Sequence, residues 1–131
     1  MSLNDYRVNP QIAVSDIERA ASFYEGKLGF TASADAVGGG RVYPCGGGSA
    51  LHLYLAPAHA GSPTGTVARW DVHDIAAVVD ELTARGVGFE RYDEPVKTDE
   101  RGIHDSGYGK VAWFRDPDGN TFALEQVPFE T

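Results

Sequence analysis

The 131-residue chain has a single cysteine, no long hydrophobic run and no basic stripe, and each absence excludes a class of protein. With Cys45 alone, no disulfide can form within the chain. Its apolar stretches are short and interrupted by charge or glycine, so none is expected to span a bilayer. Residues 1–7 are polar and contain no signal-peptide core. These features predict a cytoplasmic protein that does not contact a membrane.

Charge is biased towards one sign. The net charge is −8, and the lysines and arginines are scattered, so we expect no nucleic-acid partner. The acidic balance keeps a protein soluble and weakly favours a cationic ligand. A composition of 42% hydrophobic and 23% charged residues is typical of a globular protein, and the length allows one domain or two very small modules that share a core.

An internal repeat organises the chain. Residues 14–17 (Val-Ser-Asp-Ile) recur as residues 72–75 (Val-His-Asp-Ile), and apolar residues at helical spacing follow each copy. Ser15 and Glu18 have capping-box spacing, and Asp74 is a candidate N-cap for the second helix. Each helix is predicted to end at a glycine, Gly29 in the first copy and Gly86 in the second.

The rest of each half shows strand patterns. Leu51, Leu53 and Leu55 alternate with His52 and Tyr54, as in a strand with two different faces. The expected strands are residues 9–14, 30–36, 41–45 and 50–56 in the first half, and 66–72, 89–93, 108–115 and 121–126 in the second. The order is therefore βαβββ twice, with modules at residues 7–57 and 66–127 and a linker at 58–65.

Neither module can bury both its helix and its sheet alone. We therefore predict an α+β fold in which the two modules pair edge to edge into a curved, incomplete barrel with a concave ligand cleft. The sequence leaves open whether the modules pair within one chain or across two. Residues 95–107 form a long charged loop, for which a lid over the cleft is one hypothesis.

Three segments carry a resemblance to a known family. They are residues 12–24, residues 28–30 (Leu-Gly-Phe), and residues 111–120, which include Asp-Pro-Asp-Gly-Asn. With them the chain resembles the vicinal oxygen chelate superfamily of glyoxalases, bleomycin-resistance proteins and extradiol dioxygenases. The resemblance covers nearly the whole chain and implies the paired-module fold and a homodimer.

The resemblance also implies positions for a divalent metal, one in the first and one in the last strand of each module. Carried onto this sequence, they are Asn9, His52, Val67 and Ala123. The side chains of Val67 and Ala123 have no atom that can coordinate a metal, and a divalent ion needs three or four protein ligands. We therefore predict no metal and no other cofactor, a character closest to the metal-free members of the superfamily.

Six residues are candidates for contact with a ligand: His52, Tyr54, Tyr43, Trp70, Trp113 and His104. Aromatic side chains can stack on a flat molecule, and histidine can hydrogen-bond or move a proton. For the aromatic residues, packing in the core is the alternative. For His104, which lies among acidic residues, a solvated loop is the alternative.

The function predicted from these features is binding of a small organic molecule in a metal-free cleft, without catalysis. The alternative is a metal-dependent lyase, isomerase or dioxygenase with a rebuilt metal site. No catalytic residue can be assigned from the sequence.

Overall fold

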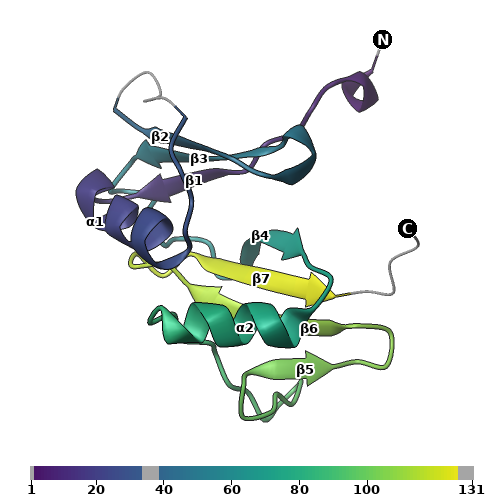
Figure 1. The fold of residues 1–131 in the computed structure, drawn as a ribbon. Coiled ribbons are helices and arrows are strands. Elements are labelled where there is room, and N and C mark those ends of the chain that lie inside the picture. Colours follow the sequence, from purple (N-terminus) through teal and green to yellow (C-terminus); the bar gives the residue numbers. More distant parts are fainter. Residues whose placement is uncertain (1, 34–38, 127–131) are drawn as a thin grey trace.

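A computed structural model of the chain describes residues 2–33 and 39–126. Its strands form two open sheets, one from each half of the sequence (Figure 1). Sheet 1 has the order β1-β3-β2, from strands β1 (Gln11–Val14), β2 (Arg41–Pro44) and β3 (Ala50–Leu55). Sheet 2 has the order β4-β7-β6-β5, from β4 (Thr66–Asp71), β5 (Ile103–Asp105), β6 (Lys110–Arg115) and β7 (Thr121–Gln126). The predicted α+β class with two small open sheets is confirmed.

The two helices occupy equivalent places in the repeat. Helix α1 (Ile17–Ala21) continues into a π-helical turn, η2 (Ser22–Lys27), and helix α2 spans Ile75–Ala84. Asp16 caps α1 by accepting the Arg19 N–H, and Asp74 caps α2 by accepting the Ala77 N–H, both at 3.1 Å. The N-cap predicted at Asp74 is confirmed, whereas the capping box predicted at Ser15 is wrong, because Asp16 is the cap and Ser15 bonds elsewhere.

Glycine ends both helices as predicted. Gly29 and Gly86 have φ values of 83° and 94°, a left-handed conformation that costs glycine little. Two short 3₁₀ helices complete the helical elements of the described residues, η1 (Leu3–Asp5) and η3 (Gly46–Gly48).

Two of the predicted strands do not form as expected. Around residues 89–93 only an isolated bridge between Phe89 and Phe114 appears, and the place of that strand is taken by β5, which lies inside the predicted loop 95–107. Residues 30–33 are not in a strand either, although the Ser33 N–H donates to the Val42 carbonyl of β2 at 3.0 Å. The rest of that predicted strand, residues 34–36, lies outside the described residues.

One hydrophobic core joins the two halves. Buried residues of β1, β3 and η2 pack with those of α2, β6 and β7, and aromatic rings dominate the contact. Tyr24 meets Phe122 edge-on at 6.1 Å, and Phe30 lies 5.8 Å from Trp70. The core therefore lies between the sheets, on the side of each sheet that carries its helix.

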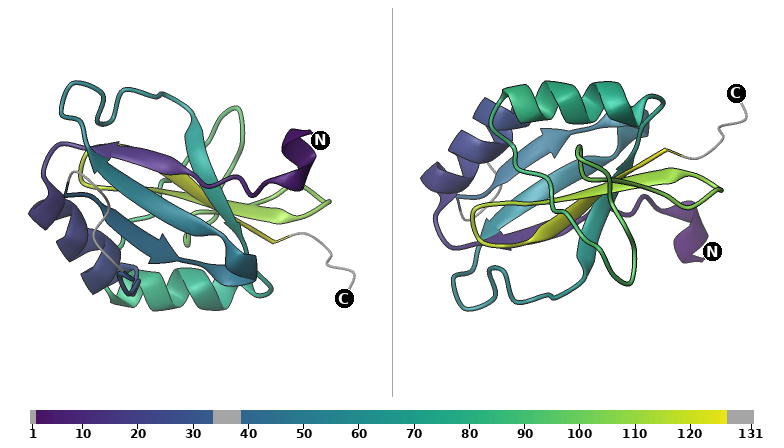
Figure 2. Two further views of the ribbon diagram at one scale, coloured as in Figure 1. Left: turned by 90° about the horizontal axis from the view of Figure 1, so that it is seen from above. Right: turned by 90° about the horizontal axis from the view of Figure 1, so that it is seen from below.

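The views from above and below show both helices on the periphery, with sheet 1 crossing over sheet 2 (Figure 2). Among the described residues, no ladder of hydrogen bonds joins the two sheets. The edge-to-edge barrel expected from the sequence is therefore not formed as one continuous sheet.

A five-residue turn between β6 and β7 fastens the halves together. We call residues 116–120 the hairpin turn. The Asn120 side chain donates to the Ala13 carbonyl of β1 at 3.0 Å and accepts the Gly61 N–H at 3.2 Å. Asp118 accepts the Ser15 N–H at 3.1 Å and pairs with Arg19 at 2.7 Å. The turn thus bonds to β1, to the start of α1 and to the segment between the sheets.

Candidate ligand-binding site

Strand register sorts the side chains of sheet 2 into two faces. Trp113 lies opposite Ala123, which lies opposite Arg69, and residues directly opposite one another point to the same side of a sheet. The intervening row, Ala112, Leu124 and Trp70, therefore points to the other side, into the core. We call the side that carries Trp113 the outer face of sheet 2.

Sheet 1 is sorted in the same way. Leu51 and Leu53 of β3 are each 1% exposed and point into the core, so His52 and Tyr54 point to the outer face of sheet 1. Tyr54 lines a cavity of about 350 Å³ between this face and the segment that carries His59. On the outer face of sheet 2, Val111 and Glu125 line a cavity of about 230 Å³.

Two of the six predicted ligand contacts belong to the core instead. Tyr43 is fully buried, stacks on Tyr24 with 5.9 Å between ring centroids, and donates its hydroxyl to Glu25 at 2.9 Å. Trp70 packs between the rings of Phe30, Phe114 and Phe122. Both rings lie in the row of side chains that faces the core, which is the alternative that the sequence left open for them.

The remaining candidates are not brought together within one chain. His52 and Tyr54 lie on the outer face of sheet 1, and Trp113 lies on the outer face of sheet 2, edge-on to Tyr92 at 5.6 Å. Because the two sheets share one core, each outer face lies on the side of its own sheet that points away from that core. A single chain therefore presents two separate half-sites.

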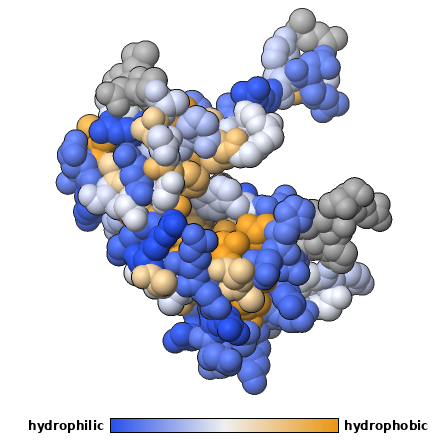
Figure 3. Space-filling view, viewed as in Figure 1, coloured by the Kyte–Doolittle hydropathy of each residue, from blue (hydrophilic) through white to orange (hydrophobic). Residues whose placement is uncertain are grey.

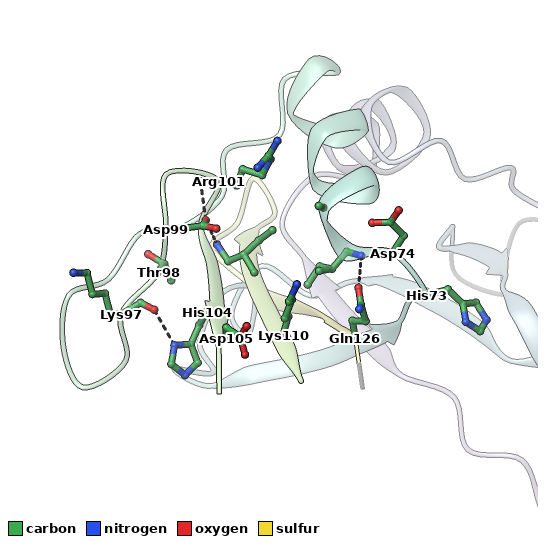
Figure 4. Close-up of a pocket in the computed structure, with 13 residues that line it drawn as sticks. His73, Asp74, Lys97, Thr98, Asp99, Arg101, His104, Asp105, Lys110 and Gln126 are labelled. Atoms are coloured by element: carbon green, nitrogen blue, oxygen red, sulfur yellow. Dashed lines mark hydrogen bonds between the residues drawn. The ribbon is translucent and has the colours of Figure 1, made fainter. Parts of the chain in front are cut away.

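By register His104 of β5 lies opposite Val111 and so belongs to the outer face of sheet 2, and it also lines a cavity of about 720 Å³ between the start of α2 and strand β5 (Figure 4). Its Nδ1 lies 2.8 Å from the Lys97 carbonyl oxygen, and the side chains of Arg101 and Lys110 also line the cavity. The loop that lines one side of this cavity is bonded within itself, where the Ile103 N–H donates to Asp99, and to α2, where Arg101 pairs with Asp80 at 2.8 Å.

The acidic groups of this cavity are already engaged in local bonds. Asp74 and Asp105 accept backbone N–H groups of Ala77 and Gly107, and Gln126 accepts the Ile75 N–H at 2.8 Å. The cavity is therefore polar, open and stabilised by its own turns. It differs in character from the aromatic outer face around Trp113.

The four positions that the resemblance implies for a metal do not suit a divalent ion. Val67 and Ala123 carry no donor atom, and the Asn9 Oδ1 already accepts the Ala50 N–H at 3.0 Å. Only the His52 imidazole remains, and one ligand cannot hold such an ion. Among the residues that the structure describes, no group of three or more His, Cys, Asp or Glu could hold one either.

Sequence reasoning did not place Arg69, Glu125 or Tyr92 beside Trp113. Arg69 of β4 donates to Glu125 of β7 at 2.7 Å, and Tyr92 covers the ring of Trp113. Alternation along β4 and β7 would have placed Arg69 and Glu125 on one face, but only the register shows that Trp113 lies on that same face.

Several solved structures resemble this one. TnmS3, described as an antibiotic binding protein from Streptomyces sp. CB03234, is 30% identical, covers 93% of this chain and 96% of its own, and has a TM-score of 0.66. A glyoxalase/bleomycin resistance protein from Catenulispora acidiphila is 24% identical over 93% of this chain and 98% of its own, with a TM-score of 0.69. A bleomycin resistance determinant encoded on transposon Tn5 is 20% identical over 95% and 99%, with a TM-score of 0.68, and shares the fold.

No curated protein matches the chain. In the described residues, no helix is long and apolar enough to cross a membrane. The model of the glyoxalase/bleomycin resistance protein/dioxygenase superfamily matches residues 7–124, which is most of the sequence. The chain therefore belongs to this superfamily.

Proposed function

We propose that this protein binds a small organic molecule, without catalysis, in a cleft that two copies of the chain complete. The observation that carries the proposal is the 30% identity, over 93% of the chain, to a protein described as antibiotic-binding. The donor-poor set Asn9, His52, Val67 and Ala123 supports binding rather than metal-dependent chemistry. We retain the cytoplasm as the proposed compartment.

A second copy is needed in this proposal because one chain holds its candidate ligand contacts on two separate faces. One chain exposes His52 and Tyr54 on one sheet and Trp113 with the Arg69–Glu125 pair on the other. If the outer face of sheet 1 in one protomer lies against the outer face of sheet 2 in its partner, the residues of both faces line one cleft between the protomers. A two-fold dimer then contains two equivalent clefts.

A flat ligand of positive charge suits such a cleft best. Trp113 and Tyr54 offer ring faces, which attract flat and cationic groups. The net charge of −8 favours the approach of a cation over that of an anion.

A mixing experiment tests the shared cleft. Dimers of His52→Ala alone and of Trp113→Ala alone each have two damaged clefts. A mixed dimer has one cleft in which both residues are intact, so mixing the variants under conditions of subunit exchange should restore part of the binding. If the cleft were built within one chain, mixing would restore nothing.

The binding probe is a panel of flat, cationic organic compounds, with bleomycin included because a structural neighbour is a bleomycin resistance determinant. Calorimetry measures affinity, and analytical ultracentrifugation measures the oligomeric state. Saturable binding that both single variants weaken, while the control Thr83→Ala, at an exposed position of α2 away from these cavities, leaves it unchanged, supports the proposal. Binding that survives both variants but is lost in Lys97→Ala would assign the ligand to the cavity of Figure 4 instead. A monomer at all concentrations would overturn the shared cleft.

A further inference from the structure

A further cavity lies between α2 and the segment that carries Phe30. The space-filling view is hollowed between the part built on sheet 1 and the part built on sheet 2, and apolar residues gather there (Figure 3). In this region a cavity of about 270 Å³ is lined mainly by apolar side chains, among them Phe30, Trp70, Val78, Leu82, Phe114 and Leu124. We call it the aromatic slot. It involves neither His52 nor Trp113 and is therefore separate from the cleft proposed above.

Aromatic rings that pack on one another form a wall of the slot. The Trp70 and Phe114 rings are stacked at 6.0 Å with 16° between their planes, and Phe30 lies 5.8 Å from Trp70 at 33°. Such an arrangement accommodates another planar ring better than a branched aliphatic group, because stacked and edge-on contacts add to apolar burial.

Charge at the slot is balanced. Glu81 and Arg85 of α2 also line it, and they pair with each other at 2.9 Å. The Arg85 guanidinium lies directly against Gly29, since a Cβ atom added to Gly29 would be 2.6 Å from the Nη1 atom of Arg85. A pair that neutralises itself gives no preference for a charged ligand, so the slot suits an uncharged ring with at most one polar group directed at this pair.

We propose that the aromatic slot is a second binding site, for a small, flat, uncharged aromatic molecule of one or two fused rings. Its volume lies just below the range of drug-sized pockets, which matches a compact ring system rather than a large antibiotic. Phe30 comes from the first half of the chain, whereas Trp70 and Leu82 come from the second. A ligand in the slot therefore bridges the halves and stabilises their packing by mass action.

The two tryptophans of the chain allow a direct test with indole as the probe. In proton–nitrogen NMR spectra each tryptophan gives one indole N–H signal, and Trp113→Phe assigns the remaining signal to Trp70. Added indole should shift the Trp70 signal saturably and leave the Trp113 signal in place. Magnetisation transfer from indole to the protons of Trp70 and Leu82 in the unaltered protein provides a readout that needs no variant.

Matched variants on α2 complete the test. Val78 lines the slot, so Val78→Phe should fill it and weaken indole binding by about tenfold or more. Ala77 is exposed and lines no part of the slot, so Ala77→Phe should leave binding unchanged. A Trp70 signal that does not move, a shift of Trp113 instead, or undiminished binding in Val78→Phe would each overturn the proposal. A shift of the Trp113 signal would place indole at the outer face of sheet 2, and the other results do not bear on the cleft there, which is tested through His52 and Trp113.

Discussion

The hydroxyl of Tyr24, in the first half of the chain, donates a 2.7 Å hydrogen bond to the buried Oδ2 of Asp116, in the second. Tyr24 is fully buried and Asp116 is 5% exposed. The same carboxylate also accepts the N–H groups of Asp118 and Asn120 at 3.0 and 2.8 Å. Asp116 thus shapes the hairpin turn and binds it to the other half through one tyrosine.

Removal of the Tyr24 hydroxyl should weaken the protein measurably. Tyr24→Phe leaves a buried carboxylate oxygen with one partner fewer, and we expect the free energy of unfolding to fall by about 1–3 kcal/mol. Urea denaturation followed by circular dichroism measures the change. The control Tyr108→Phe alters a side chain that is 87% exposed and should change stability by less than about 0.5 kcal/mol. Equal effects of the two variants would contradict the role given to this bond.

Two tyrosines should resist ionisation. Burial, then the charge of Asp116, raises the pKa of Tyr24 far above its usual value, and burial with the hydrogen bond to Glu25 raises the pKa of Tyr43. Both folded-state pKa values exceed the unfolded value of about 10, so the folded state holds these protons more tightly. The stability that they contribute is complete below pH of about 10 and is lost as the pH rises above it.

Alkaline titration checks this expectation. Tyrosinate absorbance from Tyr24 and Tyr43 should arise only together with the loss of far-ultraviolet circular dichroism. Comparison with Tyr24→Phe and Tyr43→Phe isolates the two signals. Ionisation of either residue in the folded protein would show that its burial is incomplete.

Gly61 should tolerate no side chain. Its φ is +71°, and a Cβ atom would lie 2.0 Å from the Asp118 carbonyl oxygen of the hairpin turn. Gly61→Ala should therefore lower stability by more than about 1 kcal/mol, through backbone strain and displacement of the turn. Gly65 has open space around its Cβ position, so Gly65→Ala should change the melting temperature little or raise it slightly. A melting temperature unchanged by Gly61→Ala would contradict this contact.

Metal binding should be weak. Protein purified without an affinity-metal step and then exposed to nickel, zinc, manganese and iron should retain none of them stoichiometrically, because only His52 of the four family positions is free to ligate. Plasma mass spectrometry measures the retained metal. Near-stoichiometric retention of one ion, lost in His52→Ala, would make metal-dependent chemistry the leading function.

The parts of the fold that local signals determine were predictable from the sequence. Asp74 was recognisable as an N-cap because its side chain accepts the N–H of a residue three positions later. Strand β7 was recognisable because its residues have a strand pattern and follow a tight turn. Strand β5 was missed because its three residues, with only Ile103 apolar, have no pattern of their own and pair only because β6 offers an edge.

The candidate site was harder to predict because it depends on which way each sheet faces. Trp70 and Trp113 have similar local sequences, yet one lies in the core and the other on the outer face, and register alone separates them. Which face of each sheet is covered follows from packing between the halves, which no local pattern encodes.

The hairpin turn also constrains the order of events during synthesis. Its bonds to Ala13 and Ser15 join residues 107 and 103 positions apart in the sequence. The first half cannot acquire these partners until residue 120 has left the exit tunnel. Until then the Ala13 carbonyl and the Ser15 N–H are free, and the nascent first half, with half its aromatic core uncovered, is the species most in need of protection from aggregation.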